Sequence, residues 1–399
     1  MSDISKKKEK FRLDYIDICK GFGILLMVLG HIPVSKTPMI LIYSFHMPLF
    51  FILSGLLVKS ESNLLTFISI KRKFQKLLIP YAFFFVPAYV LWFIELKPQT
   101  LNHAMKPLVA AMWDNTNNMP IAGALWFLPS LLWCSLLFAI IHQKHKNPYV
   151  IAIQVMPFVL FGFFMEVHYK GVLPWAFGIS SIGLLFYFYG YLLKHYLQLL
   201  SDKYSLFLLL LSCLTAPLIL SNGLVSMRTG TFHNIFLFIY GSVLFGTTVI
   251  VFSYKLSNSF LNQTFVIKLV KQIGEGSIVY LCLNEIFINI YKAIFNKLGL
   301  SSQLILLFAF AGTIISLFIC ERIFMKTKLK VVLGKNKNST SGYSPKSILQ
   351  EADNILDYLV EKIVVIQYGK EFFYERFCKI DKDKRWRYSK RFNQIKSSF

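Results

Sequence analysis

Ten apolar runs constrain this chain more than any other feature of its sequence. A run of about 20 apolar residues is long enough to cross the hydrocarbon core of a bilayer as an α-helix, and a helix in lipid satisfies its own backbone hydrogen bonds. The sequence therefore predicts an all-α, polytopic transmembrane bundle. The ten predicted spans are 16–34, 39–58, 77–96, 121–142, 148–167, 174–193, 204–221, 232–253, 273–295 and 302–325.

The composition agrees with a membrane protein and argues against other classes. Hydrophobic residues make up 55% of the chain and aromatic residues 16%, which is typical of neither soluble domains nor disordered chains. The net charge is +23, but Lys and Arg flank the apolar runs, so they indicate topology and contact with anionic lipids rather than nucleic-acid binding. The six cysteines form no CxxC motif or Cys/His cluster, so we expect no metal site. No permanently bound cofactor is expected either.

The distribution of positive charge predicts the orientation of the bundle. With the N-terminus inside, the N-terminal arm and the inside loops carry 17 Lys and Arg residues, whereas the outside loops carry six. Cytoplasmic loops of membrane proteins carry an excess of Lys and Arg, so the loops with 17 of these residues are assigned to the cytoplasm. The first run lacks the short apolar core and small-residue cleavage site of a signal peptide, so we expect it to be a span. Ten spans then place both termini in the cytoplasm.

The end of the chain, 334–399, is predicted to be a basic cytoplasmic tail that follows a membrane domain over 1–333. A polar linker, 334–344, opens it. The next segment is predicted to form a small amphipathic helix, which either rests on the membrane or the bundle or binds a glycan-assembly protein. Its apolar residues recur at helical spacing: Ile348, Ala352, Ile355, Leu359 and Ile363.

Two basic residues interrupt the first span, Lys20 near its inner end and His31 towards its outer end. They are eleven residues apart, which is about 20° more than three helical turns and about 16 Å along the axis. Both side chains therefore lie on nearly the same face of the helix. A polar face on a lipophilic helix should point into the bundle or a wet cavity. The alternative is that neither residue has a function. The Lys20 side chain would then extend to the inner lipid headgroups, and His31 would lie at the membrane interface.

A second histidine, His46, lies about a third of the way along the second span. An ionisable side chain at that depth in an apolar helix is costly unless it has a partner. A single buried histidine is often a packing residue. Two histidines on consecutive helices, His31 and His46, indicate a functional site more strongly.

These residues lie in segments that resemble a known family. The first two spans contain "LDYIDICKGFGILLMVLGH" and "FHMPLFFILSG", which resemble the opening of acyltransferase 3 membrane proteins. The first helix of that family carries a basic residue, ten intervening residues and a histidine, and Lys20 and His31 have this spacing. Three weaker motifs follow in the family's order, and the resemblance covers roughly 13–325: "GALWFLPSLL", "GLLFYFYGYLL" and "GEGSIVYLCLN".

The resemblance implies an enzyme of a bacterial cytoplasmic membrane. It implies transfer of an acyl group, most often acetyl, from cytoplasmic acyl-CoA to a hydroxyl group of a cell-surface polysaccharide or a lipid-linked sugar. Lys20 would then bind the phosphates of the donor. His31 would act as a general base or as an acyl carrier, with His46 as a second catalytic residue.

The chain departs from the family at two positions. Lys20 stands where the family usually has arginine, which keeps the charge but loses the planar fork that binds phosphate in two places. Asn284 stands where a histidine is frequent, so the role of that histidine stays open here. A carboxylate would help to fix the tautomer of His31, and Glu95, Glu166 and Glu285 remain candidates. The residues predicted to line the substrate pocket are Ser54, Trp126, Asn284 and Glu285.

Two other functions compete with the acyltransferase. A transporter or flippase could use Lys20, His31 and His46 as a substrate or proton path. A membrane scaffold without catalytic activity could recruit a glycan-assembly protein through its basic tail. The family motifs favour the acyltransferase.

Overall fold

The fold is known from a computed structural model of the whole chain. The predicted C-terminal tail and its amphipathic helix lie outside the residues that the structure describes, so both stay predictions. The described residues are 2–32, 36–58, 66–98, 100–113, 122–169, 173–298 and 301–333.

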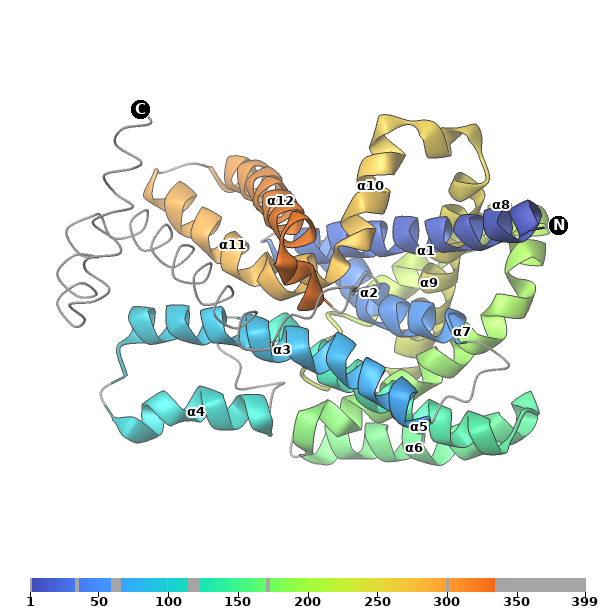
Figure 1. Cartoon of the computed structure of the whole chain (residues 1–399), viewed down its shortest axis with the longest axis horizontal. Coiled ribbons are helices and arrows are strands. Elements are labelled where there is room, and N and C mark those ends of the chain that lie inside the picture. The colour runs from blue at the N-terminus through green and yellow to red at the C-terminus, as the bar shows by residue number, and fades with distance from the viewer. Residues whose placement is uncertain are drawn as a thin grey trace. The chain divides into compact units, whose positions relative to one another are not determined.

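The described part of the chain is all-α, which confirms the predicted fold class (Figure 1). Its only β-structure is one isolated bridge. Four short 3-10 turns accompany the helices: η1 Gly123–Trp126, η2 Pro174–Ala176, η3 Phe260–Gln263 and η4 Lys328–Val331. The α-helices are α1 Ser2–His31, α2 Lys36–Leu56, α3 Phe67–Leu96, α4 Leu101–Met112, α5 Phe127–Lys144, α6 Pro148–Tyr169, α7 Phe177–Lys203, α8 Ser205–Ser221, α9 Ile235–Ser257, α10 Phe265–Glu275, α11 Ser277–Lys297 and α12 Ser302–Lys326.

A helix occupies each of the ten predicted spans. Eight helical segments in the described residues are long and apolar enough to cross a membrane, namely α2, α3, α5, α6, α7, α9, α11 and α12. The other two predicted spans correspond to α8, which is apolar but has 17 residues, and to the second half of α1, which follows a charged first half. The chain is therefore built as a multi-pass membrane protein.

Two helices lie outside the predicted spans. Helix α4 follows α3, and the side-chain hydroxyl of Tyr89 on α3 donates a hydrogen bond to Ala104 O on α4 at 2.9 Å. Helix α10 ends one residue before Gly276, so the predicted span 273–295 in fact begins with a helix break. A Cβ atom at Gly276 would lie 2.3 Å from the side chain of Glu321 on α12, so close packing requires glycine at the break.

Helix α10 crosses the middle of α1 at very short range. A Cβ atom at Gly21 would lie 2.0 Å from Val270 O, and one at Gly274 would lie 1.7 Å from Asp17 O. Small residues at such a crossing let two backbones approach each other closely. The ion pair between Lys271 and a carboxylate of α1 joins the same two helices. The middle of α1 is thereby fixed against α10.

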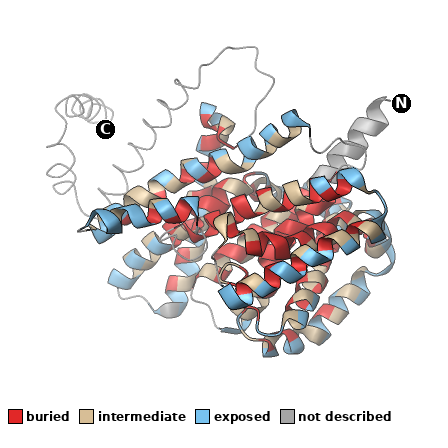
Figure 2. Ribbon diagram, turned by 90° about the horizontal axis from the view of Figure 1, so that it is seen from below, coloured by how far each residue is buried: buried red, intermediate tan, exposed pale blue. Residues whose placement is uncertain are grey.

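Buried residues gather in the interior of the bundle (Figure 2), and the C-terminal half of α1 contributes Ile24, Met27 and Val28 to them. In their most apolar windows, 72% of the residues of α2 and 78% of those in the segment containing α7 are buried, against 28% for α3 and for α12. Helices α2 and α7 are thus central, and α3 and α12 present wide apolar faces to lipid. The last turn of α1 packs beside α2 and α11, and that is where the polar residues meet.

Candidate functional site

His31 is the last residue of α1, and its ring is held by its own helix. Its Nδ1 donates a hydrogen bond to Met27 O, one turn earlier, at 2.8 Å. A neutral imidazole carries one N–H, so this bond assigns the proton to Nδ1 and leaves a lone pair on Nε2. Side chains of a helix lean towards its N-terminus, so the ring turns back into the bundle. Nε2 is therefore the reactive nitrogen.

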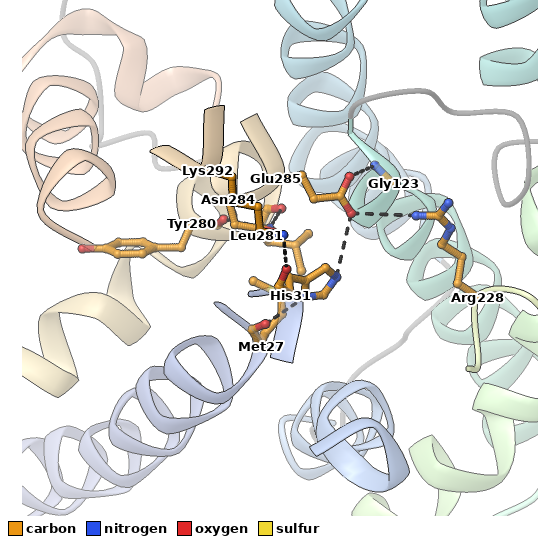
Figure 3. A network of polar contacts seen from close by, with 9 residues as sticks. All are labelled: Met27, His31, Gly123, Arg228, Tyr280, Leu281, Asn284, Glu285 and Lys292. Atoms are coloured by element: carbon orange, nitrogen blue, oxygen red, sulfur yellow. Dashed lines mark hydrogen bonds and ion pairs between the residues drawn. The ribbon is translucent and has the colours of Figure 1, made fainter. Parts of the chain in front are cut away.

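The carboxylate of Glu285 faces that nitrogen from α11 (Figure 3). Its Oε1 lies 3.8 Å from His31 Nε2 and 3.8 Å from Arg228 Nη1. Its Oε2 accepts a hydrogen bond from Gly123 N at 2.7 Å. One short bond thus fixes the carboxylate between an imidazole and a guanidinium. The gap to Nε2 is longer than a hydrogen bond, so the pair attracts only when His31 is protonated.

A side chain at Gly123 would displace the tips of Arg228 and Glu285. A Cβ atom there would lie 1.7 Å from Arg228 Nη1 and 2.8 Å from Glu285 Oε1. The residue begins η1, the short turn that leads into α5. Trp126 closes the same turn and is buried. The segment "GALWFLPSLL", 123–132, therefore supplies both a backbone donor and an aromatic wall to the site.

Arg228 comes from a hydrogen-bonded hairpin between α8 and α9. Ser226 and Thr231 exchange backbone hydrogen bonds of 2.8 and 3.0 Å on either side of it. At the base of the hairpin, Asn222 Oδ1 accepts a hydrogen bond from Asn234 N at 2.8 Å. The side chain of Asn234 in turn caps α9. These bonds fix the backbone that carries Arg228, and the guanidinium itself pairs with Glu285.

His46 and Tyr43 on α2 form the opposite wall. His46 is buried, and its Nδ1 donates to Ile42 O at 2.8 Å. The ring centroids of His31 and His46 are 6.4 Å apart, and Tyr43 lies 5.8 Å from the first and 5.0 Å from the second. The two histidines predicted from consecutive helices therefore do lie together.

These groups enclose one cavity of about 230 Å³. Four of the predicted site residues line it: His31, His46, Trp126 and Glu285. It combines a lone pair, a carboxylate, a guanidinium and aromatic walls, which suits proton transfer and recognition of a polar group. The other lining residues are Met27, Tyr43, Met47, Ala124, Ser226, Met227, Arg228 and Thr229.

Three predicted site residues are not among the described residues that line the cavity. Lys20 lies three turns before His31 on α1, and its side chain pairs with that of Asp17 at 3.4 Å. Ser54 donates its hydroxyl to Phe50 O on its own helix at 2.8 Å. Asn284 is fully buried, and its Nδ2 donates to carbonyls of its own helix. Its Oδ1 has no hydrogen-bond partner among the described residues.

Sequence reasoning missed four residues that contribute to the site or touch it. Arg228 was visible only as the single arginine among the predicted outside-loop cations. Tyr43 stands three residues before His46, a spacing that predicts a shared helix face. Gly123 acts through its backbone N–H, for which no side-chain signal exists. Lys292 is a lysine inside an apolar run, which by itself marks a functional position.

The described residues contain no group of three or more His, Cys, Asp or Glu side chains that could hold a metal ion. The chemistry available to the cavity from these side chains is that of acid, base, nucleophile and hydrogen-bond donor.

Comparison with known protein families gives a match over most of the chain. The sequence model of acyltransferase 3, described as an acyltransferase domain, matches residues 13–322. This range contains every residue of the cavity and ends within α12. No curated protein and no solved structure matches the chain.

Proposed function

Because the chain belongs to the acyltransferase 3 family, we propose that it is a membrane O-acyltransferase that moves an acyl group, most simply acetyl, from acyl-CoA to a sugar hydroxyl. The acceptor would be a cell-surface polysaccharide or a lipid-linked sugar. One observation carries the proposal: His31 Nε2 keeps its lone pair and faces both a cavity and a fixed carboxylate. An acyltransferase that activates a hydroxyl needs such a base.

The proposed reaction begins when the sugar hydroxyl loses its proton to His31 Nε2. As the proton moves, the hydroxyl oxygen bonds to the carbonyl carbon of the thioester. The intermediate then collapses, the carbon–sulfur bond breaks, and the thiolate of CoA takes the proton back from the imidazolium. Glu285, at 3.8 Å, would stabilise the imidazolium while it exists. The same lone pair could instead attack the thioester and carry the acyl group, and the geometry suits both routes.

Arg228 would act on the negative charge that develops during the transfer. Acyl transfer passes through a tetrahedral oxyanion, and donors held in place before the reaction stabilise it most effectively. The guanidinium lines the same cavity as His31 and is held by a hydrogen-bonded hairpin. It therefore offers a cation whose backbone is already in place before the reaction.

The donor is proposed to approach from the inner end of α1. Lys20 lies eleven residues before His31, about 16 Å along the helix. A lysine can bind phosphate as a point charge. The phosphates of acyl-CoA would compete with Asp17, the present partner of Lys20. The pantetheine arm would then extend towards His31.

Lys20→Ala is expected to raise the KM for acyl-CoA and leave the KM for the acceptor unchanged. Lys20→Arg should keep or improve donor binding, because arginine binds phosphate in two places. The measurement is steady-state transfer with the donor concentration varied. Lys36→Ala, an exposed lysine at the start of α2, is the matched control. An unchanged donor KM in Lys20→Ala would remove Lys20 from the donor site.

The function itself is tested with purified protein in lipid nanodiscs. Acetyl-CoA labelled in the acetyl group is supplied with de-acetylated surface polysaccharide from the source cell. We expect label in the polysaccharide as an alkali-labile ester and free CoA in equal amount. Label that remains entirely in the donor, with polysaccharides of several kinds offered, would contradict the proposal. Movement of an unmodified sugar across proteoliposomes would instead support a transporter.

A further inference from the structure

Helix α11 touches the last turn of α1 at two points. The first is Glu285, which faces the ring of His31. The second is Lys292, whose Nζ donates a hydrogen bond to His31 O at 2.9 Å (Figure 3). The two α11 residues are seven positions apart, about 20° less than two turns and about 10 Å along the axis. One face of α11 thus reaches both the side chain and the backbone of the same histidine.

The carbonyl of His31 needs a partner from outside its helix. The last four carbonyls of an α-helix have no intrahelical donor, and α1 ends at His31. The residue two positions later is Pro33, which has no N–H to offer. The ammonium of Lys292 supplies a donor. A cation beside a helix C-terminus is also favoured by the helix dipole.

The direction of the Lys292 side chain is unusual for a lysine in an apolar helix. Such lysines near a helix end normally extend their stem towards the water outside. Lys297, five residues later, is exposed in that way, whereas Lys292 is half-buried. A lysine in a membrane helix is costly, and it is kept where it has a specific partner. Here the partner is the backbone of the proposed base.

We propose that Lys292 is a positioning residue for His31. Glu285 faces the ring of His31, whereas Lys292 binds the backbone carbonyl of the same residue. Lys292 does not line the cavity, so it acts through His31 and not on the substrates. The inference rests on the proposed role of His31 in acyl transfer. A shift of about 1 Å in a reacting group can lower a rate by about 10²-fold.

Lys292→Met keeps the length of the side chain and removes its cation and donors. We expect kcat for acyl transfer to fall by about 10- to 100-fold, with both KM values nearly unchanged. Lys292→Arg restores a donor and should restore most of the rate. If the methionine variant does not accumulate in the membrane, the arginine variant can still be purified and its kcat compared with that of the wild type. Lys297→Met, on the same helix but exposed, is the control and should behave as wild type.

A double variant separates positioning from substrate binding. If Lys292 acts through His31, His31→Gln with Lys292→Met should transfer no more slowly than His31→Gln alone. A further loss by the full factor of the single variant would show that Lys292 acts elsewhere and would overturn the inference. So would a normal kcat in Lys292→Met when His31→Gln is inactive. Near-normal transfer by His31→Gln alone would refute the role of His31 itself.

Discussion

His31→Gln should transfer acyl groups about 10²–10⁴-fold more slowly than the wild type, the usual contribution of a general base. Glutamine keeps much of the size and hydrogen bonding of histidine but cannot take up a proton near neutral pH. In the wild type, Nδ1 is bound to Met27 O and Nε2 faces Glu285, so the reactive nitrogen is defined. The rate of labelled acetyl transfer at matched protein level measures the loss.

His168→Gln is a close control for this variant. His168 lies near the end of α6, and its Nδ1 donates to Phe164 O one turn earlier at 3.0 Å. It therefore repeats the backbone contact of His31 at an exposed position outside the cavity. A normal rate in His168→Gln and a strong loss in His31→Gln would assign the effect to chemistry. Near-normal acylation by His31→Gln would remove this residue from the reaction and favour the transporter or the scaffold.

Glu285→Gln should lower kcat by roughly 10- to 100-fold, which lies between the effects expected in water and near a protein surface when one of two opposite charges about 4 Å apart is removed. The amide oxygen can still accept the hydrogen bond from Gly123 N, so the position of the side chain is kept. What disappears is the negative charge 3.8 Å from His31 Nε2, which would stabilise the imidazolium. The acceptor KM should change less than kcat, because the charge matters mainly while His31 holds the proton.

The control for this change is Glu95→Gln. Glu95 was a candidate partner for His31 in the sequence, but it is exposed near the end of α3 and does not line the cavity. Its replacement should leave the rate unchanged. If Glu285→Gln raised the acceptor KM and left kcat intact, Glu285 would be a binding residue and not the partner of the imidazolium.

The bundle could be predicted from the sequence because the bilayer imposes a length on every span. Each run of about 20 apolar residues had one structural solution, and a helix occupies all ten positions. The break at Gly276 could not be predicted, because it depends on the side chain of Glu321 from another helix. The sequence predicted no separate helix at the position of α10, because this helix packs on α1 and is too short to cross the membrane.

The site was predictable only where it follows from one helix or from the family motifs. The geometry of a single helix placed Lys20 and His31 on one face, the depth of His46 in an apolar helix marked that residue, and the motifs pointed to Trp126. The contacts that define the chemistry join distant segments: Gly123 to Glu285, and Lys292 to His31. A backbone N–H or carbonyl carries no sequence signal.

The size of the cavity has a consequence for the product. Its volume of about 230 Å³ is below the roughly 300–1,000 Å³ of typical small-molecule pockets. Under the proposed reaction, it admits an acyl group and the edge of one sugar ring, while the rest of the polymer remains outside. The enzyme would then recognise single sugar residues of the polysaccharide, and neither the ends nor the length of the polysaccharide. The acyl groups that the enzyme adds should be distributed along the polysaccharide. Their density should depend on how often each sugar residue binds in the cavity.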